Sequence, residues 1–226
     1  MKTMHTGQGI RLVTALSGLL LAVLFSTSAM AQDDTTIEGS AHDFSGQGWT
    51  GLNAEICIVC HTPHNAISPD DGPLWNRSVA ATTNYTLYSP NTTPGSDLQG
   101  IFATSVGGVS KLCLSCHDGT IAIDAFGGQT GSVEIDTINA SANIGGGVIS
   151  GPDGSGDLSD DHPVAFTYPT TDTEIIAAAG GLPLFGVSGD QMECATCHDV
   201  HATNTYDELL RVDNLDSDLC LTCHDK

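Results

Sequence analysis

Four segments of this 226-residue chain carry the same pattern, in which two cysteines separated by two residues are followed directly by a histidine. The segments are CIVCH at 57–61, CLSCH at 113–117, CATCH at 194–198 and CLTCH at 220–224. This is the pattern through which c-type haem is attached, with the histidine bound to the iron. All eight cysteines of the chain fall in these segments. The sequence therefore predicts four haem c groups.

Two other uses of the cysteines explain the pattern less well. Four Cys-x-x-Cys pairs could form two four-cysteine zinc sites, but such sites do not require a histidine at the next position. Four disulfides would suit an exported chain, yet they leave the histidines unexplained as well. The residues assigned to covalent haem attachment are Cys57, Cys60, Cys113, Cys116, Cys194, Cys197, Cys220 and Cys223.

The remaining histidines match the number of haems. The motif histidines, which would bind the irons on the proximal side, are His61, His117, His198 and His224. Beyond the first 31 residues the chain has four more, which are the candidate distal ligands: His42, His64, His162 and His201. This equality predicts two histidines on every iron. Irons with both axial positions filled transfer electrons but do not bind small substrates, so we expect an electron-transfer protein at low potential and not an enzyme.

Two of the distal candidates are constrained by chain length. His64 and His201 each follow a motif histidine by three residues, in CHTPH and CHDVH. Three residues span at most roughly 10 Å, which is too short to carry the chain around the edge of a porphyrin. Each of the two therefore has to serve a haem other than that of its own motif, which would tie neighbouring irons together.

The first 31 residues have the features of a secretory signal peptide. Lys2 and Arg11 precede an apolar run from 12 to 25, and Ala-Met-Ala at 29–31 is a small-x-small cleavage pattern. The run is shorter than a membrane-spanning helix needs. We therefore expect a mature chain of residues 32–226 that is exported and not inserted in a membrane.

The charge of the chain excludes several partners. The 27 acidic residues outnumber the 6 basic ones and give a net charge of −21, and removal of residues 1–31 would leave −23. Nucleic acids and anionic membrane surfaces would repel such a chain. Only 5% of residues are aromatic, so four porphyrins are expected to supply the missing apolar mass of the core.

The fold predicted from these features is a multihaem cytochrome c, mostly coil and turns around the haems. Short helices are expected at the motifs, with N-cap candidates at Asn53, Ser110, Asp190 and Ser217. Alternation at 132–138 suggests a strand, and 207–212 suggests a short helix.

The motif order indicates an internal duplication. CHxxH followed by LCLSCHD in the first half recurs as CHxxH followed by LCLTCHD in the second. We interpret these as two di-haem modules, about 42–118 and 191–226, joined by a segment rich in Gly, Ser and Asp.

Several flanking segments resemble the OmcE-type family, extracellular tetrahaem cytochromes that polymerise into conductive filaments. The resemblance runs through most of residues 32–226, and its most specific parts are HDFSG at 42–46, CIVCHTPHNA at 57–66 and DHPVAFTY at 161–168. It also includes PLWNR at 73–77, KLCLSCHDGT at 111–120, ECATCHDVH at 193–201 and LCLTCHDK at 219–226.

The resemblance implies a continuous haem chain, all bis-histidine, with one distal ligand donated by a neighbouring copy in a head-to-tail homopolymer. His42, on an arm before the first motif, is the best candidate for that donor, although such an arm could also fold back on its own chain. The implied partners are further copies of the chain, other redox cytochromes, and external electron acceptors such as metal oxides or other cells. The alternatives are a discrete periplasmic electron carrier that donates to a reductase, and a small multihaem reductase with one high-spin site.

Overall fold

The computed structural model describes part of the chain. Contacts within the chain separate residues 1–33 from a unit of residues 34–226, and all described residues belong to the second unit. The described residues are 37–48, 55–67, 72–79, 82–88, 101–102, 105–135, 156–159, 161–201 and 206–225. They include every cysteine and every histidine except His5. The predicted signal peptide at 1–31 and the N-cap candidate Asn53 lie outside them.

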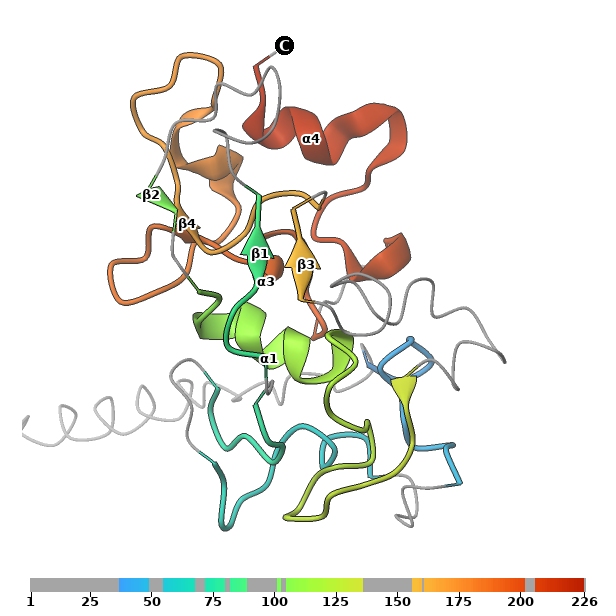
Figure 1. The fold of residues 1–226 in the computed structure, drawn as a ribbon. Coiled ribbons are helices and arrows are strands. Elements are labelled where there is room, and N and C mark those ends of the chain that lie inside the picture. Colours follow the sequence, from blue (N-terminus) through green and yellow to red (C-terminus); the bar gives the residue numbers. More distant parts are fainter. Residues whose placement is uncertain are drawn as a thin grey trace, which may run out of the picture. The chain divides into compact units, whose positions relative to one another are not determined.

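Regular structure in the described residues is sparse, as the sequence predicted, and three of the four motifs lie in short helices (Figure 1). Helix α1 spans Gly108–His117 and contains the second motif, whereas α3 at Cys194–Cys197 and α4 at Asp218–Cys223 contain most of the third and fourth. The first motif, Cys57–His61, forms turns instead of a helix, so the expectation of a helix there is wrong. Short 3-10 turns are described at η3 (Ala177–Gly181), η4 (Asp207–Leu209) and η5 (Leu215–Ser217).

The helix starts differ from the predicted N-caps in two of the three testable cases. Helix α1 begins after Gly107, so Ser110 lies inside its first turn, where its hydroxyl and backbone N–H both contact the buried carboxylate of Glu193. Glu193 itself is the N-cap of α3, in place of Asp190, and forms a capping box with Thr196. Ser217 is the N-cap of α4 but makes no side-chain capping bond. One buried carboxylate therefore joins the second and third motifs.

The described strands are all two residues long and pair segments that are distant in sequence. Strand β1 (Thr86–Leu87) pairs in parallel with β3 (Asp157–Leu158). The central strand β4 (Phe166–Thr167) pairs antiparallel with β2 (Ile101–Phe102) and β5 (Gln191–Met192). The strand predicted at 132–138 is absent from residues 132–135, and its remainder is outside the described part. The alternation there instead places Ile135 in a buried position.

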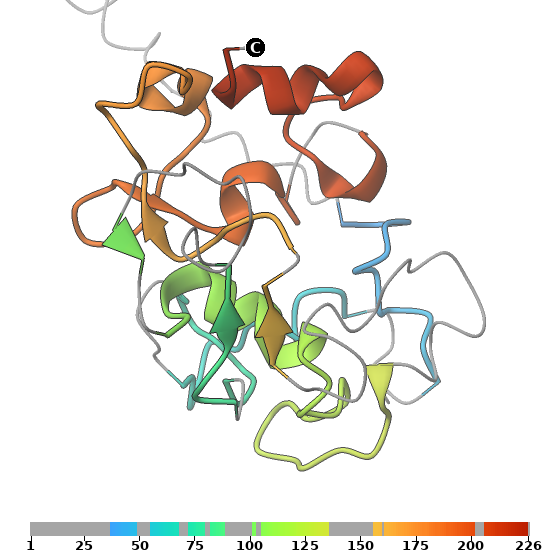
Figure 2. The same cartoon turned by 45° about the horizontal axis from the view of Figure 1, so that its top comes forward.

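Among the described residues, buried apolar side chains form two small clusters. One gathers around Tyr85 and Leu114 of α1, and the other around Phe166, Met192 and Cys223. In the second cluster α4 packs against η3 (Figure 2). Gly180 of η3 has φ +61°, and a Cβ there would collide with the Thr222 carbonyl of α4. The close approach holds the fourth motif against residues 177–181.

In the part of the chain described above, no helix is long and apolar enough to cross a membrane.

Candidate haem-binding site

The motifs share a backbone hydrogen bond that sets the histidine relative to the first cysteine. The backbone N–H of the histidine donates to the carbonyl of the first cysteine: His61 to Cys57 at 2.8 Å, His198 to Cys194 at 3.0 Å and His224 to Cys220 at 2.9 Å. In the second motif the same residues lie within α1. One helical turn therefore brings both thiols and the imidazole toward one cofactor, even where no full helix forms.

Two motif histidines have the ring orientation that a metal ligand needs. Nδ1 of His61 lies 2.8 Å from the Pro73 carbonyl oxygen, and Nδ1 of His198 lies 2.9 Å from that of Glu208. A carbonyl accepts a hydrogen bond, so Nδ1 carries the proton and Nε2 is left with its lone pair. Such a bond fixes the ring and increases its basicity as a ligand. Both residues therefore fit the proximal position of a haem.

Two motif histidines each lie opposite a spare histidine. The ring centroids of His61 and His201 are 6.0 Å apart, and those of His42 and His117 are also 6.0 Å apart, with interplanar angles of 30° and 52°. Two imidazoles that bind one iron from opposite sides, each at about 2 Å, have ring centres about 6 Å apart. The residues present therefore fit a haem iron between each pair.

His42 is buried among other imidazoles. Burial, followed by the proximity of His117, His198 and His201, lowers the pKa of His42 to about 4. The ring is therefore neutral at physiological pH and keeps a lone pair for a metal. Its Nδ1 is buried without a hydrogen-bond partner in the structure. The structure thus places His42 beside a motif histidine of its own chain, and its role in a neighbouring copy stays a prediction.

The two other spare histidines are placed less completely. Desolvation lowers the pKa of His162 and the proximity of His224 adds to this, whereas a contact with the Pro163 carbonyl opposes it. His162 therefore lies near the fourth motif. His64 is exposed, and its backbone N–H and carbonyl both contact the Thr62 hydroxyl.

The four cysteine pairs follow one another in space. Cys60 of the first motif is close enough to Cys116 of the second to contribute, with burial, to raising the Cys60 pKa to about 11. The thiols of Cys113 and Cys194 interact directly, which raises the pKa of Cys113 and lowers that of Cys194. In the third motif, burial and then the proximity of Cys223 raise the pKa of Cys197 to about 11. Neighbouring attachment sites thus run from the first motif to the fourth.

The first and third motifs continue into loops with matching hydrogen bonds. We call residues 57–77 the first loop and residues 194–211 the second loop. In the first loop, Thr62 N–H donates to the Leu74 carbonyl and Asn76 N–H donates to the Cys60 carbonyl, both at 2.8 Å. In the second loop, Asp199 N–H donates to Leu209 and Arg211 N–H to Cys197, again at 2.8 Å. Leu74 and Leu209 both have left-handed backbones, with φ of 56° and 58°.

Side-chain hydrogen bonds to the motifs also match between the two loops. The Asn76 amide donates to the Ile58 carbonyl at 2.5 Å, and Arg211 Nε donates to the Ala195 carbonyl at 2.8 Å. Ile58 and Ala195 each follow the first cysteine of their motif. The two loops are therefore structural counterparts, in which Asn76 and Arg211 occupy the same place.

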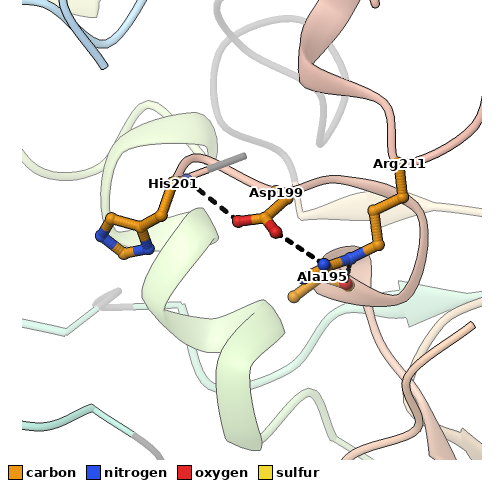
Figure 3. A network of polar contacts seen from close by, with 4 residues as sticks. All are labelled: Ala195, Asp199, His201 and Arg211. Carbon is orange, nitrogen blue, oxygen red and sulfur yellow. Dashed lines mark hydrogen bonds and ion pairs between the residues drawn. The ribbon is translucent and has the colours of Figure 1, made fainter. Parts of the chain in front are cut away.

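The second loop holds its spare histidine through an ion pair (Figure 3). The Asp199 carboxylate accepts from the His201 backbone N–H at 3.0 Å and from Arg211 NH1 at 2.6 Å. The imidazole of His201 extends away from this network (Figure 3). In the first loop Thr62 contacts His64 in the corresponding position. The polar residue directly after each motif histidine thus anchors the next histidine, a role that the sequence analysis did not predict although CHTPH and CHDVH both show the spacing.

No group of three or more His, Cys, Asp or Glu side chains among the described residues could by itself hold a metal ion.

Comparison with known proteins supports the identification of the motifs. Residues 187–226, which contain the third and fourth motifs, match the family described as the doubled CXXCH motif. The match points to a multihaem c-type cytochrome, a class of protein that carries covalently bound haem c and transfers electrons. No curated protein matches the chain.

Proposed function

We propose that this protein carries four haem c groups, each with two axial histidines, and conducts electrons along them. The observation that carries the proposal is the pair of 6.0 Å imidazole separations, His61–His201 and His42–His117, at the distance that a shared iron requires. When bound, each haem supplies a one-electron couple between ferric and ferrous iron.

The chain's residues have distinct roles in this proposal. Each motif holds one haem covalently through its two cysteines and binds the iron through its histidine. His201 completes the haem of the first motif, and His42 completes that of the second. His162, which lies near His224, completes the fourth. By elimination His64 completes the third, so the first and second loops exchange their spare histidines.

With both axial positions filled by protein, the irons have no site for a small substrate, which supports electron transfer over catalysis. Carbonyl oxygens orient the rings of His61 and His198, so these two proposed ligands are held in place independently of the redox state. The succession of neighbouring thiols from Cys60 to Cys223 supports a path in the order of the motifs.

Redox titration of the native protein, followed by its visible spectrum, tests this function. We expect four one-electron couples at low potential and no spectral response to cyanide or carbon monoxide on a short timescale. Rapid ligand binding at one haem would indicate an open iron and favour the multihaem reductase.

Two forms of assembly are compatible with this function. A discrete exported carrier is favoured by the position of His42, whose ring lies beside His117 of the same chain. A head-to-tail filament is favoured by the OmcE-type resemblance, in which one axial ligand comes from the next copy. A ligand exchanged between copies would couple polymerisation to haem binding and form an open, heterologous contact.

The His42→Ala variant distinguishes the discrete carrier from the filament. If His42 acts within its chain, the variant remains as dispersed as the native protein and one haem becomes high-spin. If His42 acts between copies, filaments of the native secreted protein visible by electron microscopy disappear in the variant. His162→Ala is the matched control, because it removes a distal ligand whose counterpart is expected in the same chain under both forms.

The proposed location is outside the cytoplasm, because the chain combines c-type haem attachment motifs with an export signal predicted at 1–31. The proposed partners are other redox cytochromes and external acceptors such as metal oxides or other cells. The net charge of −21 favours partners with basic surfaces and disfavours nucleic acids.

A further inference from the structure

Arg77 is a buried cation with an incomplete set of partners. Its side chain is 0% exposed, and it is the only basic residue among the described ones that is buried. NH1 donates to the Ile123 carbonyl at 2.5 Å and NH2 to the Ala122 carbonyl at 3.0 Å. Nε–H is buried and has no acceptor. Within the described residues no carboxylate forms an ion pair with Arg77.

The backbone places this charge between two haem attachment sites. The residue before it, Asn76, is bonded through its N–H to the Cys60 carbonyl, and through its amide to Ile58 of the same motif. The Arg77 guanidinium binds the carbonyls of residues 122 and 123, which shortly follow the second motif. Arg77 therefore bridges the first motif and the segment after the second.

The second loop also contains an arginine, one position away from the counterpart of Arg77, and its charge is paired. Arg211 bonds the Ala195 and Cys197 carbonyls of the third motif, its side chain is 26% exposed, and its NH1 lies 2.6 Å from the Asp199 carboxylate. The two arginines therefore differ in burial and in whether a carboxylate compensates them.

We infer that Arg77 sets the redox potential of the haem on Cys57 and Cys60, and to a smaller extent that of the haem on Cys113 and Cys116, by acting as a buried positive charge that forms no ion pair with the described carboxylates. Reduction of ferric to ferrous iron lowers the charge of the centre by one. A nearby positive charge therefore favours the reduced form, and it does so more strongly where burial excludes water. Arg77 makes the first haem a better electron acceptor than the haem of the third motif, where Asp199 cancels the effect of Arg211. This inference rests on the proposed haem function.

Potentiometric titration of the Arg77→Gln protein tests the inference, with Arg77→Lys as the charge-conserving control. In Arg77→Gln we expect the ratio of reduced to oxidised haem at a fixed potential to fall at least tenfold for one haem, a shift of about 59 mV for one electron. The other low-spin signals should move less. Arg77→Lys should keep the native potentials. An equal fall in Arg77→Lys would overturn the inference, since packing and not charge would then be the cause.

The Asp199→Asn variant provides an independent test if the Arg77→Gln protein does not accumulate. The amide has the same size and keeps one acceptor oxygen, which can serve the His201 N–H, while the negative charge that faces Arg211 is lost. We expect the potential of one haem to rise, by less than the Arg77→Gln shift because Arg211 is partly exposed and screened by water. Unchanged potentials in a fully loaded Asp199→Asn protein would overturn the inference. Absence of covalent haem from the native protein would instead contradict the proposed function.

Discussion

The two loops use one backbone scaffold and differ in what their side chains do with charge. Both bond the motif histidine to a carbonyl 10 or 12 residues later, both have a left-handed leucine at the turn, and both anchor a second histidine through the residue after the motif. The first loop uses the neutral Thr62 and Asn76, and the buried Arg77 adds a lone charge. The second uses the paired Asp199 and Arg211. The comparison teaches that the shared backbone positions the histidines, whereas the side chains around them differ in charge.

The largest effect is expected from removing His201 or His64, the histidines that the two loops are proposed to exchange. We expect His201→Ala to convert the haem of the first motif, and not that of its own motif, to a high-spin form. Its potential should move by a sizeable part of the roughly 0.8 V range that axial ligands control. Magnetic circular dichroism and spectroelectrochemistry measure both changes. His64→Ala is the reciprocal variant, and it should affect the haem of the third motif.

A smaller effect is expected at Asn76 and Arg211, which occupy the same place. Asn76→Ala leaves the partly buried Ile58 carbonyl without its donor and should cost about 1–2 kcal/mol of stability. Arg211→Asn should keep a donor for the Ala195 carbonyl and lose only the partly exposed ion pair, at about 0.5–1 kcal/mol. Chemical denaturation of the loaded proteins measures both. Equal losses would show that the two positions are not equivalent.

The residues that anchor the spare histidines should also contribute unequally to stability, with the larger loss expected in the second loop. Asp199→Ala removes a carboxylate that accepts two hydrogen bonds, one of them from a guanidinium, and should destabilise the protein by about 1–2 kcal/mol. Thr62→Ala removes a weaker neutral contact and should cost about 0.5 kcal/mol. A larger loss at Thr62 than at Asp199 in thermal unfolding would break the proposed correspondence.

The smallest effect is expected at the left-handed leucines. Leu74 has φ 56° and its side chain is 53% exposed, so little packing is lost on truncation. Leu74→Gly should relieve the backbone strain and stabilise the protein by about 0.5 kcal/mol. Leu209→Gly, at a less exposed position, should give a smaller gain. Destabilisation at both positions in the same denaturation experiment would indicate that the leucine side chains, and not the turn, hold the loops.

The haem-attachment motifs are easier to recognise from the sequence than the local structure is. The CxxCH pattern is a covalent requirement of haem attachment and can be read without knowing the fold, and the sparse, coil-rich character followed from composition. N-caps were harder to predict: Ser110 bonds Glu193, a residue 83 positions away, and such tertiary contacts cannot be deduced from spacing. The strand expected at 132–138 failed in its described part because a short alternating run does not specify a pairing partner.

The roles of Arg77, Asp199 and Arg211 could not be predicted from the sequence either. PLWNR and DELLRV do not look alike, since the structural match aligns Asn76 with Arg211 and shifts the two arginines by one position. Only the hydrogen bonds back to the motif carbonyls reveal the correspondence. The segment 207–212, expected to be a helix, forms a single 3-10 turn because Glu208 and Leu209 adopt left-handed conformations before Leu210 pairs with His198.

The central claim, four haems that each have two histidine ligands, is tested most directly by low-temperature EPR of the fully oxidised native protein, integrated against protein concentration. The account predicts four low-spin ferric centres per chain and no high-spin signal. A stoichiometric high-spin signal, or fewer than four centres, would contradict it.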